Sequence, residues 1–166
     1  MGQMKNALHH NGLVAQLAYA VQIAVMLFYP AIALAGPDDP SVAGGDVTIT
    51  NPDPATTLIQ QGTDRAIVNW RGFSIDVNEL VEVQQPGADS VLLNRVTGGD
   101  PSNILGSLVA NGRVFIVNPN GVVFGPGSHV DAAGILATTF KIDDADFMGG
   151  HYNFAQDPNA QLAAII

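Results

Sequence analysis

Short apolar runs alternate with turn-forming residues along most of the chain after Gly36. The runs are three to six residues long, most contain β-branched or aromatic side chains, and most end at Gly, Pro, Asn or Asp. No sustained helical periodicity appears in this region. The pattern therefore predicts an all-β fold, with strands at Val47–Thr50, Thr57–Gln61, Ala66–Trp70, Phe73–Val77, Leu80–Val83, Ser90–Leu93, Arg113–Val117, Val122–Phe124, His129–Asp131, Gly134–Thr139 and Tyr152–Phe154.

One segment between these strands has the signature of a helix start. Asp100 suits the N-cap position, and Pro101 suits the first helical position, where its missing N–H costs nothing. Ile104 and Leu108 would then share one face of the helix. We expect one short helix near residues 101–109.

The spacing of the strands is irregular, and no strict short repeat is present. Two all-β architectures fit such a chain, a β-sandwich and a β-helix. Asn tolerates left-handed backbone conformations and bonds to its own backbone, which suits the turns of a β-helix but also those of a sandwich. The Asn residues near expected turns are Asn69, Asn78, Asn94, Asn111, Asn118 and Asn120.

Residues 1–35 differ from the rest of the chain. Lys5 precedes an apolar stretch from Leu13 to Ala35, which ends in small residues. A basic start, an apolar middle and an Ala-x-Ala end are typical of a secretory signal peptide, so we expect the general secretion machinery to take the chain and cleavage to follow Ala35. A membrane anchor is the alternative, because the apolar stretch approaches the ~20 residues that a span needs; Pro30 favours cleavage.

Composition narrows the functional classes. The 166 residues include 15 acidic and 6 basic residues, giving a formal charge of −9, and residues 36–166 keep all the acidic ones and five basic ones, giving −10. This charge argues against a nucleic-acid partner, which requires a basic surface. The absence of Cys excludes disulfides, thiol nucleophiles and Cys-bound metals.

No cofactor or metal site is expected. Asp143, Asp144 and Asp146 lack the other ligand positions of a calcium loop, and we interpret them as a solvated acidic turn. His129 and His151 have no further ligands spaced to complete a zinc site. The chain shows no catalytic motif, and we expect no enzymatic activity.

The segment Asn118–Gly121 separates two apolar runs and reads as a tight turn. Pro119 fixes φ at the second turn position, and we expect Asn120 to take positive φ at the third. Gly121 then releases the chain into the next strand without steric penalty. On physical grounds alone, this is a well-formed turn.

Several blocks of sequence together carry a family resemblance. They are Ile67–Ile75, Val91–Gly98 (VLLNRVTG), Asn111–Gly125 (NGRVFIVNPNGVVFG) and Gly134–Thr139. In this order and spacing they resemble the amino-terminal two-partner secretion (TPS) domain of filamentous haemagglutinin-like exoproteins, also known as the haemagglutination activity domain. The resemblance extends from about Val47 to Phe154.

The resemblance implies a fold, a partner and a location. The fold is a right-handed parallel β-helix with flanking or capping antiparallel strands. The partner is a POTRA-bearing outer-membrane β-barrel transporter of a Gram-negative bacterium, which exports the chain from the periplasm to the cell surface or the medium. The domain would direct secretion and nucleate β-helix folding of a surface or secreted adhesin or toxin.

The resemblance also marks candidate site residues. Asn118, Pro119, Asn120 and Gly121 match the family's secretion motif, and Asn94 and Arg95 match its Asn-Arg-Val block. Whether these residues contact the transporter or shape the domain stays open. Arg95, one of five basic residues after residue 35, could form an ion pair, contact a partner or be a solvated surface residue.

Two other functions are considered. An adhesin module would bind host-cell glycans or receptors through exposed aromatic side chains, but we expect Trp70, the only Trp, to lie in the core. A β-helix polysaccharide lyase would need clustered Asp, Lys or Arg, and Lys141 is the only Lys after residue 35. Family members are far longer than this chain, so we expect residues 36–166 to be a secretion domain that is incomplete at its C-terminal end.

Overall fold

The computed structural model describes residues 36–158 and 163–166. These residues belong to one compact unit, Leu34–Ile166. The predicted signal peptide, residues 1–35, lies outside the described residues. Within the described ranges, no helix has the length and apolar character required to cross a membrane.

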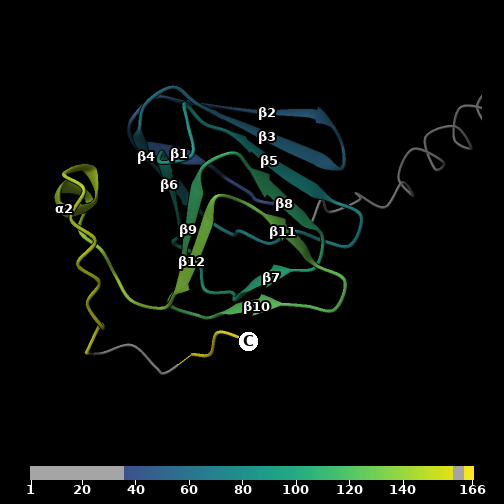
Figure 1. Ribbon diagram of the computed structural model, residues 1–166. Helices are drawn as coiled ribbons and strands as arrows, with labels where there is room; N and C mark the ends of the chain where they lie inside the picture. Colours follow the sequence, from purple (N-terminus) through teal and green to yellow (C-terminus); the bar gives the residue numbers. More distant parts are fainter. Residues whose placement is uncertain (1–35, 159–162) are drawn as a thin grey trace, which may run out of the picture. The chain divides into compact units, whose positions relative to one another are not determined.

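The described chain folds into three β-sheets and one short helix (Figure 1). The first sheet has the order β1-β4-β6-β9-β12, the second β11-β8-β5-β3-β2, and the third pairs β10 with β7. The bounds are β1 Ser41–Gly44, β2 Val47–Asp53, β3 Thr56–Gln61, β4 Arg65–Trp70, β5 Leu80–Gln84, β6 Val91–Val96, β7 Ser102–Ile104, β8 Ser107–Ala110, β9 Arg113–Val117, β10 Val122–Phe124, β11 His129–Asp131, β12 Gly134–Thr138 and α2 Asp144–Met148.

The chain visits the three sheets in turn and so forms a parallel β-helix of about four coils. Successive coils pair in parallel, for example β4 with β6, β6 with β9, and β9 with β12. In the second sheet, Thr56 pairs with Leu80, Leu80 with Ser107, and Ser107 with His129, so the coils differ in length. This variation in coil length explains why the sequence shows no regular repeat. The parallel pairing of successive coils identifies the fold as the β-helix rather than the β-sandwich.

Antiparallel strands flank the first coil, as expected. Strand β1 pairs antiparallel with β4, and β2 pairs antiparallel with β3. Both lie at the edge of a sheet, so each covers a strand edge that would otherwise be open.

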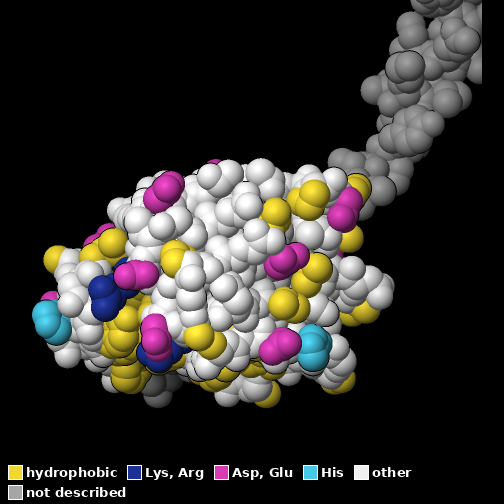
Figure 2. All heavy atoms as spheres, turned by 45° about the horizontal axis from the view of Figure 1, so that its top comes forward, with side chains coloured by type: hydrophobic (Ala, Val, Ile, Leu, Met, Phe, Trp, Pro, Cys, Tyr) yellow, Lys and Arg dark blue, Asp and Glu magenta, His cyan; other side chains and the backbone are white. Residues whose placement is uncertain are grey.

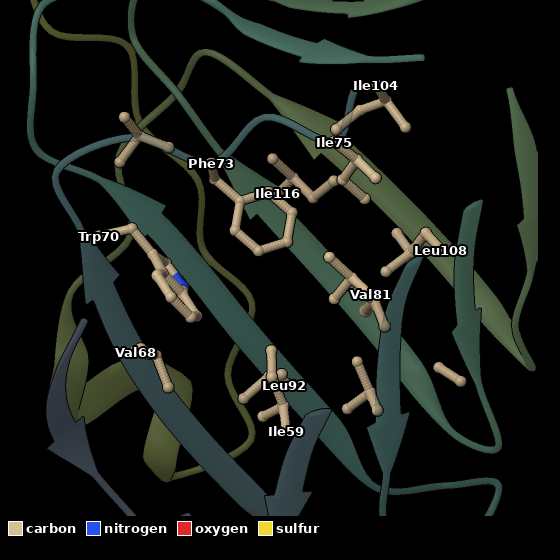
Figure 3. Close-up of a cluster of buried hydrophobic side chains, with 14 of the residues drawn as sticks. Ile59, Val68, Trp70, Phe73, Ile75, Val81, Leu92, Ile104, Leu108 and Ile116 are labelled. Atoms are coloured by element: carbon tan, nitrogen blue, oxygen red, sulfur yellow. The ribbon is translucent and has the colours of Figure 1, made fainter. Parts of the chain in front are cut away.

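The inside of the coils is filled by a continuous apolar cluster (Figure 3). Leu92 pairs in register with Val114, and both are fully buried, so like side chains stack from coil to coil. Trp70 is 1% exposed and contacts Phe73 edge-on, with ring centroids 5.5 Å apart. Trp70 is thus a core residue, as the sequence indicated.

A second apolar cluster lies on the outer face of the first sheet. Phe115 of β9 points outward and meets Phe147 of α2 and Tyr152, at centroid distances of 6.1 and 5.2 Å. In Figure 1, α2 and the chain that follows it run outside β9 and β12. This segment, residues 140–155, is called the outer strap below. It buries an apolar face that would otherwise contact water.

The prediction of a helix near residues 101–109 is wrong. This region forms β7 and β8, with Ser102 and Ile104 buried and Asn103 between them exposed, which is a strand period of two. Pairing of β8 with β5 and of β7 with β10 overrides the local helix-start signal of Asp100 and Pro101.

The helix present is α2, and it begins where the sequence suggested only a solvated acidic turn. The Asp143 side chain is the N-cap and accepts hydrogen bonds from the backbone N–H groups of Ala145 and Asp146. Asp144 and Asp146 lie in the first turn, where the positive end of the helix dipole interacts favourably with acidic side chains.

Two expected strands do not form. Within Phe73–Val77, only Ile75 forms a bridge, with Ile104. Within Tyr152–Phe154, Tyr152 and Phe154 pack against the second apolar cluster, and the one nearby bridge joins Ala155 to Lys141.

Candidate functional site

The Asn-Pro-Asn-Gly segment forms the corner between β9 and β10. The Gly121 N–H donates to the Asn118 carbonyl at 3.0 Å, which closes a four-residue turn. The Asn120 N–H donates to the Asn118 Oδ1 at 2.9 Å, so the Asn118 side chain also braces the turn from within.

The turn differs in one respect from the expectation. Positive φ occurs at Gly121, at 105°, and not at Asn120. A Cβ added at Gly121 would lie 2.8 Å from the Ala164 carbonyl oxygen. The glycine is therefore required both by its backbone conformation and by the close approach of the chain's last described residues.

Asn118 is fully buried and joins its corner to the preceding coil. Its Nδ2 donates to the Asp100 carbonyl and to the Ser102 Oγ, each at 3.0 Å. Ser102 is itself fully buried. A buried amide with all these partners stabilises the corner, and its loss would leave them unpaired.

Asn120 and Pro119 occupy the outer part of the same corner. Asn120 is exposed, and its Nδ2 donates to the Gly98 carbonyl of the preceding coil at 2.9 Å. Pro119 is half-buried. The motif thus divides into a buried half, Asn118 and Gly121, and an outer half, Pro119 and Asn120.

Asn94 lies inside the β-helix, in the middle of β6. It is fully buried, and its Oδ1 accepts a hydrogen bond from the Trp70 Nε1–H at 3.0 Å. Its Nδ2 donates to the Phe115 carbonyl at 3.4 Å. The Asn94 side chain therefore provides the hydrogen-bond acceptor that the buried Trp70 indole N–H needs. This role explains why a polar residue lies among apolar ones.

Arg95 points outward from the same strand and holds the outer strap. Its Nη2 donates to the Asp144 Oδ1 at 2.5 Å and to the Ile142 carbonyl at 3.0 Å, while Nη1 donates to the Asn69 Oδ1 at 3.2 Å. Its side chain is 21% exposed. Of the roles considered for Arg95, the structure shows the ion pair.

The two motif blocks meet at one hollow. Arg95, Pro119 and Lys141 of the outer strap all line it. The full lining is Arg95, Val96, Thr97, Val117, Pro119, Lys141, Ile142, Asp143 and Asp144. The hollow, called the corner hollow below, combines apolar residues such as Val117 and Ile142 with charged groups of both signs.

Charge on the described surface is mainly acidic, and most basic groups are paired. Arg71 pairs with Asp38, Arg95 with Asp144, Arg113 with Asp89 and Lys141 with Asp157. Figure 2 shows acidic side chains scattered over one face, with the visible basic groups beside acidic ones. No basic patch for nucleic acid is present on that face.

Metal-binding groups are not assembled in the part of the chain that the structure describes. No three His, Asp or Glu side chains there are placed to share an ion. His129 begins β11 and is exposed.

The outer strap is the feature that sequence reasoning missed. One signal for it exists: Val114–Val117 of β9 is apolar at every position, and all four residues are buried. A strand that buries successive residues is covered on both faces, so such a run indicates a second layer outside the coil.

Comparison with known proteins places this fold in a family. The model of the TPS secretion domain matches residues 35–165. A heme/hemopexin-binding protein of Haemophilus influenzae is 38% identical over 112 residues, which are 68% of this chain and 12% of that protein. A protein of the same name from H. influenzae strain Rd is 43% identical over 107 residues, which are 64% of this chain and 12% of that protein.

A solved structure shares the architecture. The crystal structure of the HMW1 secretion domain from H. influenzae aligns with a TM-score of 0.74 and 35% identity over 78% of this chain and 34% of that chain. The chain thus spans about an eighth of the two curated relatives and a third of the solved domain. The match confirms the predicted β-helix with flanking strands.

These findings bear out the resemblance in the sequence. The family is a secretion domain rather than an enzyme family, and its presence implies export across an outer membrane with a cognate transporter. The chain belongs to the TPS secretion domain family of two-partner secreted exoproteins.

Proposed function

We propose that residues 36–166 direct secretion by binding a POTRA-bearing outer-membrane β-barrel transporter at the corner hollow and at the exposed Asn120 beside it. The observation that carries this proposal is that Arg95 and Pro119, from two separate motif blocks, line the same hollow. A lining that mixes apolar and charged residues suits a specific protein contact, because apolar area supplies affinity and charges set the orientation.

The motif residues have different roles in this proposal. Asn94 and Asn118 are fully buried, so in the folded domain they position the corner rather than touch a partner. Pro119 lines the hollow, and Asn120 is the exposed residue that follows it on the same corner; these two residues are the ones that the transporter contacts. Gly121 permits the turn, and Arg95 fixes the strap at the edge of the hollow.

Export begins at residues 1–35. The general secretion machinery takes this signal peptide to the periplasm, and cleavage follows Ala35. The transporter then passes the remaining chain to the cell surface or the medium. The proposed cargo of this route is a surface or secreted adhesin or toxin.

The domain also nucleates folding of the β-helix. Each coil pairs in register with the preceding coil, and the Asn118 and Asn120 amides bond backward to the preceding corner. Residues that emerge later can therefore add to a template that is already in place. Folding outside the cell then opposes backward movement of the chain.

Direct glycan binding by this domain is less well supported. A glycan platform needs exposed aromatic rings. Trp70 is 1% exposed and its indole is bonded to Asn94, and the rings of Phe115, Phe147 and Tyr152 pack on one another. Phe140, 40% exposed, is a single ring and does not form a platform by itself.

A secretion assay tests the proposal. The chain is co-expressed with a candidate transporter, and exported protein is measured for Asn120→Ala, with Asn103→Ala, an exposed Asn on β7, as the matched control. We expect Asn120→Ala to lower export and Asn103→Ala to leave it unchanged. Undiminished export of Asn120→Ala, with the transporter present, contradicts the assigned role.

A further inference from the structure

The first described residues are fixed to the first coil. The Asp38 N–H donates to the Gly72 carbonyl at 2.9 Å, and the Arg71 N–H donates to the Asp38 carbonyl at 3.1 Å. The Asp38 carboxylate also pairs with the Arg71 guanidinium. Gly36, two residues earlier, is half-buried. The backbone at Gly36 is thus held close to the coil.

A carboxylate lies directly beside Gly36. A Cβ added at Gly36 would lie 3.6 Å from the Glu79 Oε2 and 3.9 Å from its Oε1. The backbone nitrogen of a residue is about 2.5 Å from its Cβ position, so the Gly36 nitrogen lies within about 6 Å of the Glu79 Oε2, a gap that a rotation of the free terminus or of the Glu79 side chain can close. Both residues line one hollow with Pro37, Asp38, Asn51 and Thr57.

Glu79 has no cationic partner among the described residues. Its Oε2 accepts a hydrogen bond from the Asp76 N–H at 2.8 Å, and none of the four ion pairs there includes it. The other charged groups nearby are Asp38 and Asp76, which are acidic, and Arg71, which is engaged by Asp38. The hollow therefore offers negative charge without a matching cation.

We propose that removal of residues 1–35 creates an ion pair between the new α-ammonium group of Gly36 and the Glu79 carboxylate. In the uncleaved chain the Gly36 nitrogen is a neutral amide and cannot form this pair. After hydrolysis of the Ala35–Gly36 bond, the same nitrogen carries a positive charge beside Glu79. Signal removal thereby fastens the first segment onto the end of the coil stack. The inference rests on the proposed cleavage after Ala35.

The pair has a defined pH window. An α-ammonium group has an ordinary pKa of about 8, and a neighbouring carboxylate raises it in the folded state. The added stability is therefore fully present below about pH 8 while Glu79 is ionised, and it is lost as the pH rises through the raised pKa.

Titration of the processed chain tests the proposal. Residues 36–166 are produced with Gly36 as the first residue by removal of a tag, so the test does not depend on a signal peptidase. The α-ammonium pKa is measured by carbon-13 NMR at the Gly36 Cα. We expect a value raised by about half a unit or more above the ordinary pKa near 8. We expect the ordinary value in Glu79→Gln, whose side-chain oxygen can still accept from the Asp76 N–H.

A second measurement separates the pair from other effects of the substitution. Thermal unfolding at pH 7 is compared for free and N-acetylated chains, each with Glu79 or with Glu79→Gln. Acetylation should lower the midpoint only when Glu79 is present. An unshifted α-ammonium pKa, or an equal effect of acetylation in both backgrounds, overturns the proposal.

Amino-terminal sequencing of the exported protein distinguishes this inference from the proposed transporter contact. Gly36 at the terminus supports the inference, and cleavage at another bond overturns it. The transporter contact is judged independently by the export of Asn120→Ala.

Discussion

The Asn118 Nδ2 donates to the Ser102 Oγ at 3.0 Å, and both side chains are fully buried between adjacent coils. The bond joins the β9–β10 corner to the start of β7 in the preceding coil. A motif noticed for its turn-forming residues thus supplies a cross-link between coils. This arrangement explains why the first Asn of the motif is placed inside the domain.

Loss of the Asn118 amide should destabilise the domain. In Asn118→Ala, the Ser102 hydroxyl, the Asp100 carbonyl and the Asn120 N–H all lose a partner. We expect the free energy of unfolding to fall by about 2–3 kcal/mol, because unpaired buried polar groups are costly. Urea denaturation of residues 36–166 measures it.

Asn120→Ala is the matched comparison, because Asn120 is exposed. We expect a loss of under about 1 kcal/mol for this substitution. Equal destabilisation by the two substitutions would show that the buried and outer halves of the motif do not differ as described.

The Trp70–Asn94 pair should behave as a coupled unit. Trp70→Phe removes the indole donor and leaves the Asn94 Oδ1 without that partner. We expect a loss of about 2–3 kcal/mol, which combines the unpaired acceptor with the smaller ring. Adding Asn94→Leu should cost less in the Trp70→Phe background than in the wild type, as measured by a double-mutant cycle. Strictly additive effects would contradict the coupling.

Two glycines offer a test of the backbone requirement at the corner. Gly121→Ala introduces a Cβ at φ 105° and 2.8 Å from the Ala164 carbonyl oxygen. We expect it to lower the unfolding free energy by about 1–3 kcal/mol. Gly87 has negative φ and no atom within 4 Å of an added Cβ, so Gly87→Ala should be neutral or slightly stabilising. Similar thermal midpoints for both variants would argue against strain at Gly121.

The outer strap should open when its buried ring is removed. Phe147 is fully buried, and Phe147→Ala should destabilise the strap by about 3 kcal/mol. Hydrogen exchange should accelerate in residues 142–150 while the interior strands stay protected. Phe140, 40% exposed, provides the control, since Phe140→Ala removes little buried area. Uniformly faster exchange across the domain would show that the strap does not open on its own.

The strands were predictable because their signals are local. Most expected runs, such as Leu80–Val83 and Arg113–Val117, coincide with strands, since alternation and turn residues act over a few positions. The prediction for the segment after Asp100 was wrong because it also used only local signals. Its first residues suit a helix, but pairing with distant strands determines its structure.

The geometry of the candidate site depends on longer-range contacts. Arg95 bonds to Asp144, 49 residues away, and Trp70 bonds to Asn94, 24 residues away. Such pairs follow from the coil lengths, which vary and leave no periodic trace. The motif residues could be identified from the sequence, but their division into buried and outer groups could not.

A direct binding measurement tests the central claim, which is that the transporter contacts the outer half of the motif. The periplasmic part of a cognate transporter is titrated with residues 36–166 carrying Asn120→Ala or the control Asn103→Ala, and the unfolding midpoint of each variant is recorded. We predict that Asn120→Ala weakens binding about tenfold, a free-energy change of about 1.4 kcal/mol, with its unfolding midpoint close to that of the wild type. Binding of Asn120→Ala at wild-type affinity would contradict the account.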